Sequence, residues 1–211
     1  IAQAIPTYMM SVFQLSASVC EDLERAIRKF WWGGEKDQRR THWVAWEKFT
    51  RCKARGGLGF RDLKIFNQAL LARQAWRLIE FPNSLCARLM KARYYPNGDL
   101  LDTAFPAQVS PTWRAIMHGL DLLKRGAIWR VGDGTSIKIW RHAWIPRGFT
   151  LRPAGQRRPC RLKWVSDLID GETRSWKVDV LHRFFHAHDV GVIQKIQIPW
   201  RQAEDVVAWH G

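Results

Sequence analysis

The feature that most constrains the fold is an apolar stripe between residues 62 and 80. Ile65, Ala69, Ala72, Trp76 and Ile79 recur at intervals of four, three, four and three residues. This spacing places them on one face of an α-helix. A glycine-rich stretch precedes the segment and a proline follows it, and both residue types interrupt helices. We therefore expect a helix over 62–80 that is buried along this stripe.

Shorter helices are predicted on either side from their capping signals. The predicted helices are 6–15, 18–32, 84–94 and 110–126. The second begins at the S-x-x-E capping box of Ser18, the third at Ser84, and the last runs from Ser110 to Gly126. The clearest strand signal is IWRVGDGTSIKIW at 128–140, where apolar residues alternate on both sides of Asp133-Gly134. This pattern predicts a β-hairpin with a type I′ turn. The fold class is thus mainly α, in the α+β class.

These elements divide the chain into three predicted regions. A helical bundle covers 1–94, a unit with one helix, the hairpin and a basic linker covers 95–164, and an irregular tail covers 165–211. The chain begins with Ile1 rather than Met, and we expect it to be a segment of a longer polypeptide. No apolar run approaches the roughly 18 residues that a membrane-spanning helix needs, so no membrane partner is predicted.

The charge balance suggests a polyanionic partner. The chain has 34 Lys and Arg residues against 19 Asp and Glu residues, a net charge of +15. Such an excess is typical of nucleic-acid binding, although it also promotes solubility. Between Asp133 and Asp167 there are 33 consecutive positions without an acid and eight with a base. This stretch is either a phosphate-binding surface or a solvated linker.

Such a partner would be a nucleic acid, bound through phosphate contacts. Arg73 and Arg77 lie one turn apart on the long helix, where they either follow a phosphate backbone or cover Trp76 with their aliphatic stems. The predicted nucleic-acid-binding residues are Arg51, Lys53, Arg55, Arg61, Arg73, Arg77, Lys138, Arg141, Arg157, Arg158, Arg161 and Lys163. Trp129 and Trp140 either stack on bases or pack in the core; the spacing favours the core.

The glycine-rich sequence KARGGLGFRD at 53–62 does not fit a nucleotide-binding loop. Its glycines lack the G-x-x-x-x-G-K-[ST] spacing and the G-x-G-x-x-G spacing. We interpret Gly56, Gly57 and Gly59 as residues of a tight turn.

No catalytic, metal or cofactor site is predicted. The four cysteines are widely spread without a C-x-x-C pair, which fits a reducing compartment. His182, His186 and His188 follow one another at helical spacing, but without H-E-x-x-H they are better explained as an exposed helix tip.

The ordered series of motifs resembles one known family. It comprises IPTYMMSVFQL, LERAIRKFWWGG, HWVAWEKFTRCKARGGLGFRDLKIFNQALLARQAWRL, ARYYPNG, WRAI, GAIWRVGDGTSIKIWRHAWIP and VSDLID. In this order the motifs are similar to the region just after the palm of plant LINE-type (non-LTR) retroelement reverse transcriptases. The resemblance covers about 5–209. In this family GGLGF leads into the helix that carries the N-x-A-L-L pattern, here Asn67 to Leu71.

The resemblance implies that 1–94 is thumb-like and that the chain handles nucleic acid without catalysing a reaction. The partners that it implies are RNA and an RNA–DNA hybrid or DNA, bound through phosphate contacts. The parent enzyme would be an RNA-directed DNA polymerase that uses Mg²⁺ held by palm aspartates. Its expected location is inside the cell, and for the parent element in the nucleus. Its partners would include the rest of the polyprotein, with a zinc-binding segment downstream. The paired aspartates of the palm are absent from this sequence. Ser16 and His142 depart from the family pattern, and a decayed or domesticated remnant that acts as a structural or protein-interaction module is the alternative.

Overall fold

The structure is a computed structural model that describes residues 4–33, 44–148, 150–155, 159 and 161–210. The chain divides into two compact units. The first unit contains Ile1–Tyr94 and Phe105–Leu123, and the second contains Tyr95–Ala104 and Lys124–Gly211. The predicted division at 94 and 164 stays a prediction. None of the described helices is long and apolar enough to cross a membrane.

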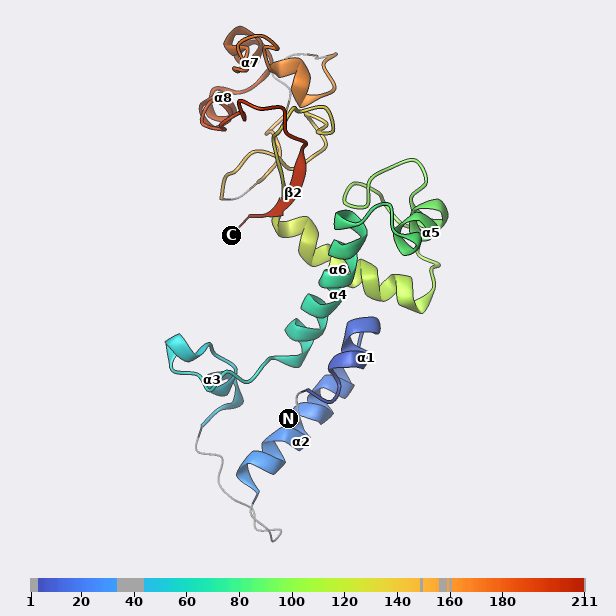
Figure 1. Ribbon diagram of the computed structural model, residues 1–211. Helices are drawn as coiled ribbons and strands as arrows, with labels where there is room; N and C mark the ends of the chain where they lie inside the picture. The colour runs from blue at the N-terminus through green and yellow to red at the C-terminus, as the bar shows by residue number, and fades with distance from the viewer. Residues whose placement is uncertain (1–3, 34–43, 149, 156–158, 160, 211) are drawn as a thin grey trace. The chain divides into compact units, whose positions relative to one another are not determined.

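The first unit is helical. Its elements are α1 (Thr7–Val12), α2 (Ala17–Trp32), α3 (Trp46–Phe49), a 3₁₀ turn (Lys53–Arg55), α4 (Leu63–Glu80), α5 (Leu85–Tyr94) and most of α6 (Pro111–Gly126). Helices α1 and α2 both pack on α4 (Figure 1). Local caps explain several boundaries, because Asp62 accepts the N–H of Ile65 and Ser84 accepts the N–H of Ala87. Helix α2 begins two residues earlier than the Ser18 signal indicates, since Ser16 is its N-cap.

The buried face of α4 differs from the predicted stripe. The buried residues are Leu63, Asn67, Leu71, Ala72, Ala75 and Leu78, and of these only Ala72 belongs to the predicted stripe. Ile65 and Ala69, which were predicted to be buried, are exposed, and Ile65 has 66% of its surface accessible. The prediction was wrong for these two residues because it counted only apolar residues, whereas the buried face also contains the polar Asn67.

Asn67 is buried because its amide completes the backbone hydrogen bonds around the end of α1. Its Nδ2 donates to the carbonyl oxygens of Met10 at 2.6 Å and Phe13 at 2.9 Å. Its Oδ1 accepts the N–H of Leu15 at 2.9 Å. A helix end leaves carbonyl groups without partners, and a buried end must find them elsewhere. Asn67 therefore fixes α1 and the turn into α2 against α4.

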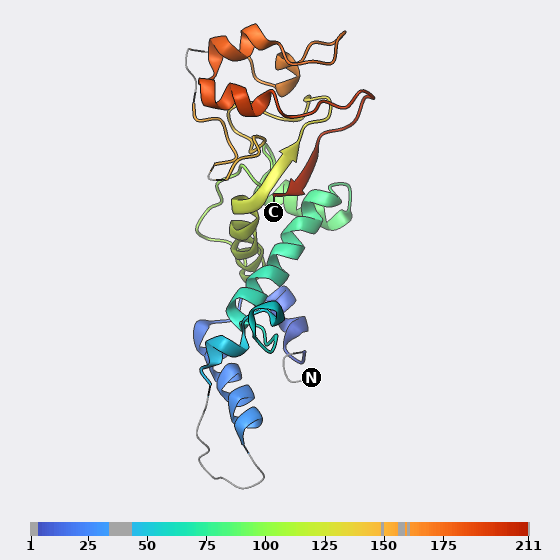
Figure 2. The same ribbon diagram turned by 90° about the vertical axis from the view of Figure 1, so that its left-hand side faces the viewer.

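The second unit has a small antiparallel strand pair and short helices. Its elements after α6 are β1 (Ala127–Arg130), a 3₁₀ turn (Val165–Leu168), α7 (Val178–Phe184), α8 (Ala187–Ile193) and β2 (Val206–Trp209). Figure 2 shows β1 and β2 side by side. The core of this unit includes Ile137, Ile139 and Trp144 from the middle of the chain, and Leu181 and Ile193 from α7 and α8. The fold class is confirmed, since the protein is mainly helical with one small antiparallel strand pair.

The predicted hairpin has a different strand partner. The first strand forms, but β1 pairs with β2, in the register Ala127 to Trp209 and Arg130 to Val206. The reason lies in the loop at 132–136, which wraps around the Asp205 carboxylate. The carboxylate oxygens of Asp205 accept the N–H groups of Gly132 at 2.7 Å, Gly134 at 2.9 Å and Ser136 at 2.8 Å. These bonds hold the start of β2 beside β1 in place of the 137–140 segment.

Candidate nucleic-acid interface

The glycine-rich loop is a turn in which most of the backbone N–H groups already donate to carbonyl oxygens. The N–H groups of Leu58 and Phe60 both donate to the Phe49 carbonyl, and that of Gly57 donates to Cys52. Gly56 has φ +78° and Gly59 has φ +74°, which side chains larger than glycine rarely adopt. A phosphate-binding loop needs free N–H groups that converge on the ligand. This loop therefore connects α3 to α4 and does not cradle a phosphate.

The predicted cations around the loop are exposed. Arg51, Lys53, Arg55 and Arg61 all reach solvent. The stem of Lys53 lies over Gly59, where an added Cβ would come within 3.2 Å of the Lys53 Cε. Arg61 precedes α4 and lies over the ring of Phe66 at 4.2 Å. The turn thus holds the first three side chains within a short segment and presents their charges to solvent.

A second group of predicted cations lies on α4 itself. The exposed α4 stripe consists of Ile65, Ala69, Arg73 and Arg77, spaced four residues apart. Its two arginines are about 6 Å apart along the helix axis, from the rise per residue. Among the residues that the structure describes, neither Arg73 nor Arg77 forms an ion pair. Both charges are therefore available to an anionic ligand, on the face opposite Leu71 and Leu78.

The acid-free stretch between Asp133 and Asp167 is partly neutralised by acids from elsewhere in the second unit. Lys138 lies 3.5 Å from the Asp99 carboxylate, and Arg141 lies 2.8 Å from that of Asp102. Arg147 is buried and forms an ion pair with the fully buried Asp189. Arg161 and Lys163 are exposed. Arg157 and Arg158 lie outside the described residues.

His142 shows how tightly part of this stretch is built. Its Nδ1 accepts the backbone N–H of Lys138 at 3.2 Å, which leaves Nε2 to donate to Asp99 at 3.2 Å. The ring also stacks on Trp129 at 5.3 Å. The hydrogen bond from His142, and then the charge of Lys138, hold the pKa of Asp99 below its usual value. A residue at this position must accept one bond and donate another, and His142 does both within the folded core.

The other sequence candidates lie in structural roles. Trp140 stacks on Phe185 at 4.7 Å, as the core interpretation predicts. Asp189, the acid nearest to the histidine run, accepts bonds from Arg147 and the Ala154 N–H. His182, His186 and His188 are exposed. In the described part of the chain, no three His, Cys, Asp or Glu side chains gather as metal ligands.

Helix α5 carries cations that the sequence reasoning missed. Arg88, Lys91 and Arg93 are exposed, and Arg93 lies over the Tyr94 ring at 5.5 Å. No acid occurs at the 18 positions 81–98, between Glu80 and Asp99. This second acid-free run is the signal that would have found them. It makes α5 an extension of the basic surface of the first unit.

Two curated proteins of Arabidopsis thaliana are similar to the chain. "Uncharacterized mitochondrial protein AtMg00310" is 44% identical over 151 residues, which is 71% of this chain and 98% of that protein. "Putative ribonuclease H protein At1g65750" is 33% identical over 149 residues, or 69% of this chain. The match spans only about a quarter of that second protein, 24% of its length. No protein-family model and no solved structure matches the chain.

Proposed function

Because the chain belongs to the same family as the uncharacterized mitochondrial protein of Arabidopsis thaliana, we propose that it is a plant retroelement-derived segment that handles nucleic acid. The finer proposal is a non-catalytic segment of a non-LTR retroelement reverse transcriptase. The ordered motifs support it, and so does the second relative, whose name refers to ribonuclease H. An intracellular location, nuclear for the parent element, belongs to the same proposal.

The observation that carries the proposal is the pair of arginines on the α4 stripe, which form no ion pair with any described residue. Arg73 and Arg77 project from a helix that is fixed through Leu71 and Asn67 to the rest of its unit. A rigid helix with two free guanidinium groups one turn apart suits contact with successive phosphates, which positions a backbone without reading its sequence. The exposed cations of the 51–61 loop and of α5 increase the positive charge of the same unit.

The described residues do not fit the metal chemistry of a polymerase. Two-metal phosphoryl transfer needs carboxylates that converge on the ions. The described chain has no such group of three ligands. We assign the Mg²⁺ of the parent enzyme to its palm, whose paired aspartates are not in this sequence.

Equilibrium binding to a labelled RNA–DNA hybrid tests the proposal. We expect the affinity to fall steeply with salt, because each phosphate contact releases counterions. The affinity should also be the same for hybrids of unrelated sequence. A variant with Arg157, Arg158, Arg161 and Lys163 changed to Ala measures the contribution of the acid-free stretch. If all four contact phosphates, the slope of log affinity against log salt should fall by about 3 to 4. Absence of binding by the wild-type chain at low salt would contradict the proposal.

A protein-interaction module is the second candidate function. The match spans 98% of the mitochondrial relative, so that relative consists almost wholly of the shared region. Leu85 and Leu89 of α5 are 72% and 60% exposed, one turn apart, and exposed apolar residues of this kind favour a protein contact. Sedimentation of the wild-type chain and of a Leu85→Ser/Leu89→Ser variant tests this. Self-association or capture of the rest of the polyprotein that depends on both leucines would support the interaction module.

A further inference from the structure

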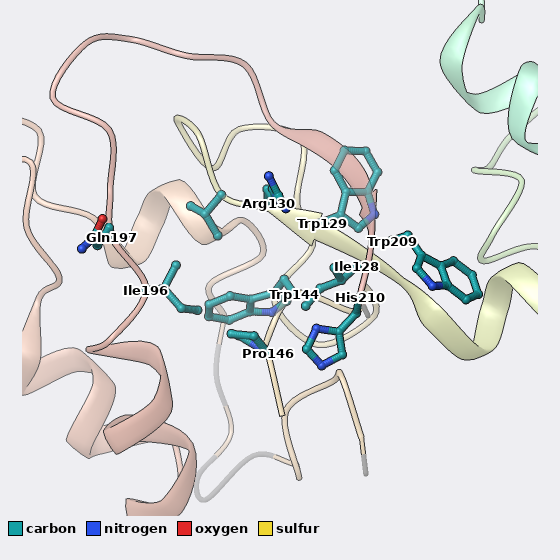
Figure 3. Close-up of a pocket in the computed structure, with 10 residues that line it drawn as sticks. Ile128, Trp129, Arg130, Trp144, Pro146, Ile196, Gln197, Trp209 and His210 are labelled. Carbon is teal, nitrogen blue, oxygen red and sulfur yellow. The ribbon is translucent and has the colours of Figure 1, made fainter. Parts of the chain in front are cut away.

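The loop 194–205, which joins α8 to β2 in the second unit, is fixed near both of its ends. Near its start, the Trp176 Nε1–H donates to the Ile196 carbonyl at 2.9 Å. The Ile196 side chain also packs against the core of this unit (Figure 3). At the other end, the Asp205 carboxylate accepts three N–H groups from the 132–136 loop. The backbone of the loop is therefore attached to the unit on both sides.

The middle of the loop is held by an arginine in an unusual backbone conformation. The Arg174 guanidinium donates to the Pro199 carbonyl from Nε at 3.3 Å and from Nη2 at 3.0 Å. Arg174 has a φ of +52°, and no other described residue apart from glycine has a positive φ. Glycine adopts this conformation more easily than arginine does. What the arginine adds at this position is the pair of hydrogen bonds that fixes Pro199.

Trp200 follows Pro199 and is the most exposed large apolar side chain that the structure describes, at 89%. The next residues, Arg201 and Gln202, are polar and exposed, whereas Ile198 is partly buried against the core. A protein-binding surface normally needs a contiguous apolar patch, which this loop lacks. An isolated indole among polar groups instead fits a ligand with a flat face and a polar edge, such as a nucleobase.

We propose that Trp200 stacks on an unpaired base of a bound nucleic-acid strand, and that Arg174 holds the loop in position for this contact. Because the loop backbone is already fixed, it loses little conformational entropy on binding. The proposal rests on the proposed function, since it adds a base contact to the same nucleic-acid-binding role. The α4 stripe contacts phosphates of any backbone, whereas Trp200 requires an unstacked base.

The test compares a short labelled RNA strand with an abasic strand of the same length and charge, by fluorescence anisotropy. The wild-type chain should bind the RNA strand more tightly. Trp200→Ala should weaken RNA binding about fivefold or more and leave abasic-strand binding unchanged, because one stacked base contributes at least this factor. Trp200→Phe should restore most of the preference. Phe30→Ala is the matched control, because Phe30 is an 80% exposed aromatic residue of the first unit, and it should bind like the wild type.

Arg174→Gly tests the positioning role. Glycine suits the positive φ, so the melting temperature should stay close to that of the wild type although both bonds to Pro199 are lost. The preference for the RNA strand should nevertheless fall severalfold. Loss of one cation does not explain such a change, because the two strands carry the same charge. An unchanged preference would show that Arg174 does not position the loop for binding.

A cross-linking measurement on the wild-type chain does not depend on the folding of a variant. A strand that carries a photoreactive base should cross-link to the tryptic peptide 196–201, which contains Trp200. Equal affinity for the RNA and abasic strands, cross-linking only to other peptides, or Trp200-dependent binding of a protein in place of RNA would overturn the assignment. Retained hybrid binding would then leave the proposed function standing, whereas absence of all binding by the wild-type chain would remove both.

Discussion

Replacement of Asn67 by alanine should destabilise the first unit strongly, since one side chain makes three buried hydrogen bonds. The substitution removes the donors to Met10 and Phe13 and the acceptor for Leu15. Each net hydrogen bond contributes about 1 kcal/mol, and a buried group left without a partner costs about 1–3 kcal/mol. Water entry relieves part of this cost, so we expect a loss of about 3–5 kcal/mol in the free energy of unfolding.

Urea unfolding followed by far-UV circular dichroism measures this loss. Asn83→Ala is the matched control, because Asn83 is an exposed asparagine in the same unit. Its midpoint should stay close to that of the wild type. If Asn67→Ala unfolds at the same urea concentration as Asn83→Ala, the buried amide does not hold α1 in place and the account of this unit is refuted.

An Asn67→Asp variant separates the acceptor from the donors. Its carboxylate keeps the bond from Leu15 but faces two carbonyl oxygens in a buried site. Burial raises the pKa of a carboxyl group in the folded state, so the protonated form is favoured there. The variant should therefore be most stable at pH values below about 3.9, the unfolded pKa, and should lose stability relative to wild type as the pH rises.

Three further predictions concern the second unit and catalysis. Asp205→Ala should lower the stability of the second unit by about 2–4 kcal/mol, because its carboxylate accepts three backbone N–H groups; Asp205→Asn should recover only part of this loss in thermal melts. The pKa of Asp99 is lowered in the folded state, so its stabilisation is present above about pH 3.9 and is lost as the pH falls through the folded pKa. Asp99→Asn should flatten the acid side of a melting-temperature profile, and an unchanged profile would rule out this role. Primer extension on a primed RNA template with Mg²⁺ should give only background, and template-dependent incorporation by the purified chain would contradict a non-catalytic role.

Helix positions were predictable from the sequence because their signals are local. Asp62, Ser84 and Ser110 each accept an N–H from the first turn of the helix that follows, and such caps act within three residues. The rotation of α4 was not predictable in the same way. Periodicity favoured the face with Ile65, whereas the burial of Asn67 depends on carbonyl groups more than 50 residues earlier in the chain.

The sequence indicated which basic residues could form the candidate site, but not which of them form ion pairs with acids. Arg73 and Arg77 are exposed, which is what phosphate contact requires. The partners of Lys138 and Arg141 are acids about 40 residues away, and no sequence pattern links them. The strand partner of β1 was hidden for the same reason. Its bonds depend on Asp205, which lies about 70 residues beyond the loop that binds it.

The salt dependence of hybrid binding by an α4 variant tests the central claim most directly. Arg73→Ala/Arg77→Ala removes the two free charges of the α4 stripe. Arg25→Ala/Lys64→Ala is the matched control, because these exposed cations of the same unit are paired with Asp22 and Glu21 at 2.6 and 2.8 Å.

For the α4 variant, the slope of log affinity against log salt should fall by about 2, and for the control it should change little. An equal change in both variants would show a diffuse effect of charge. An unchanged slope in the α4 variant would contradict the assignment of this helix to the nucleic-acid interface.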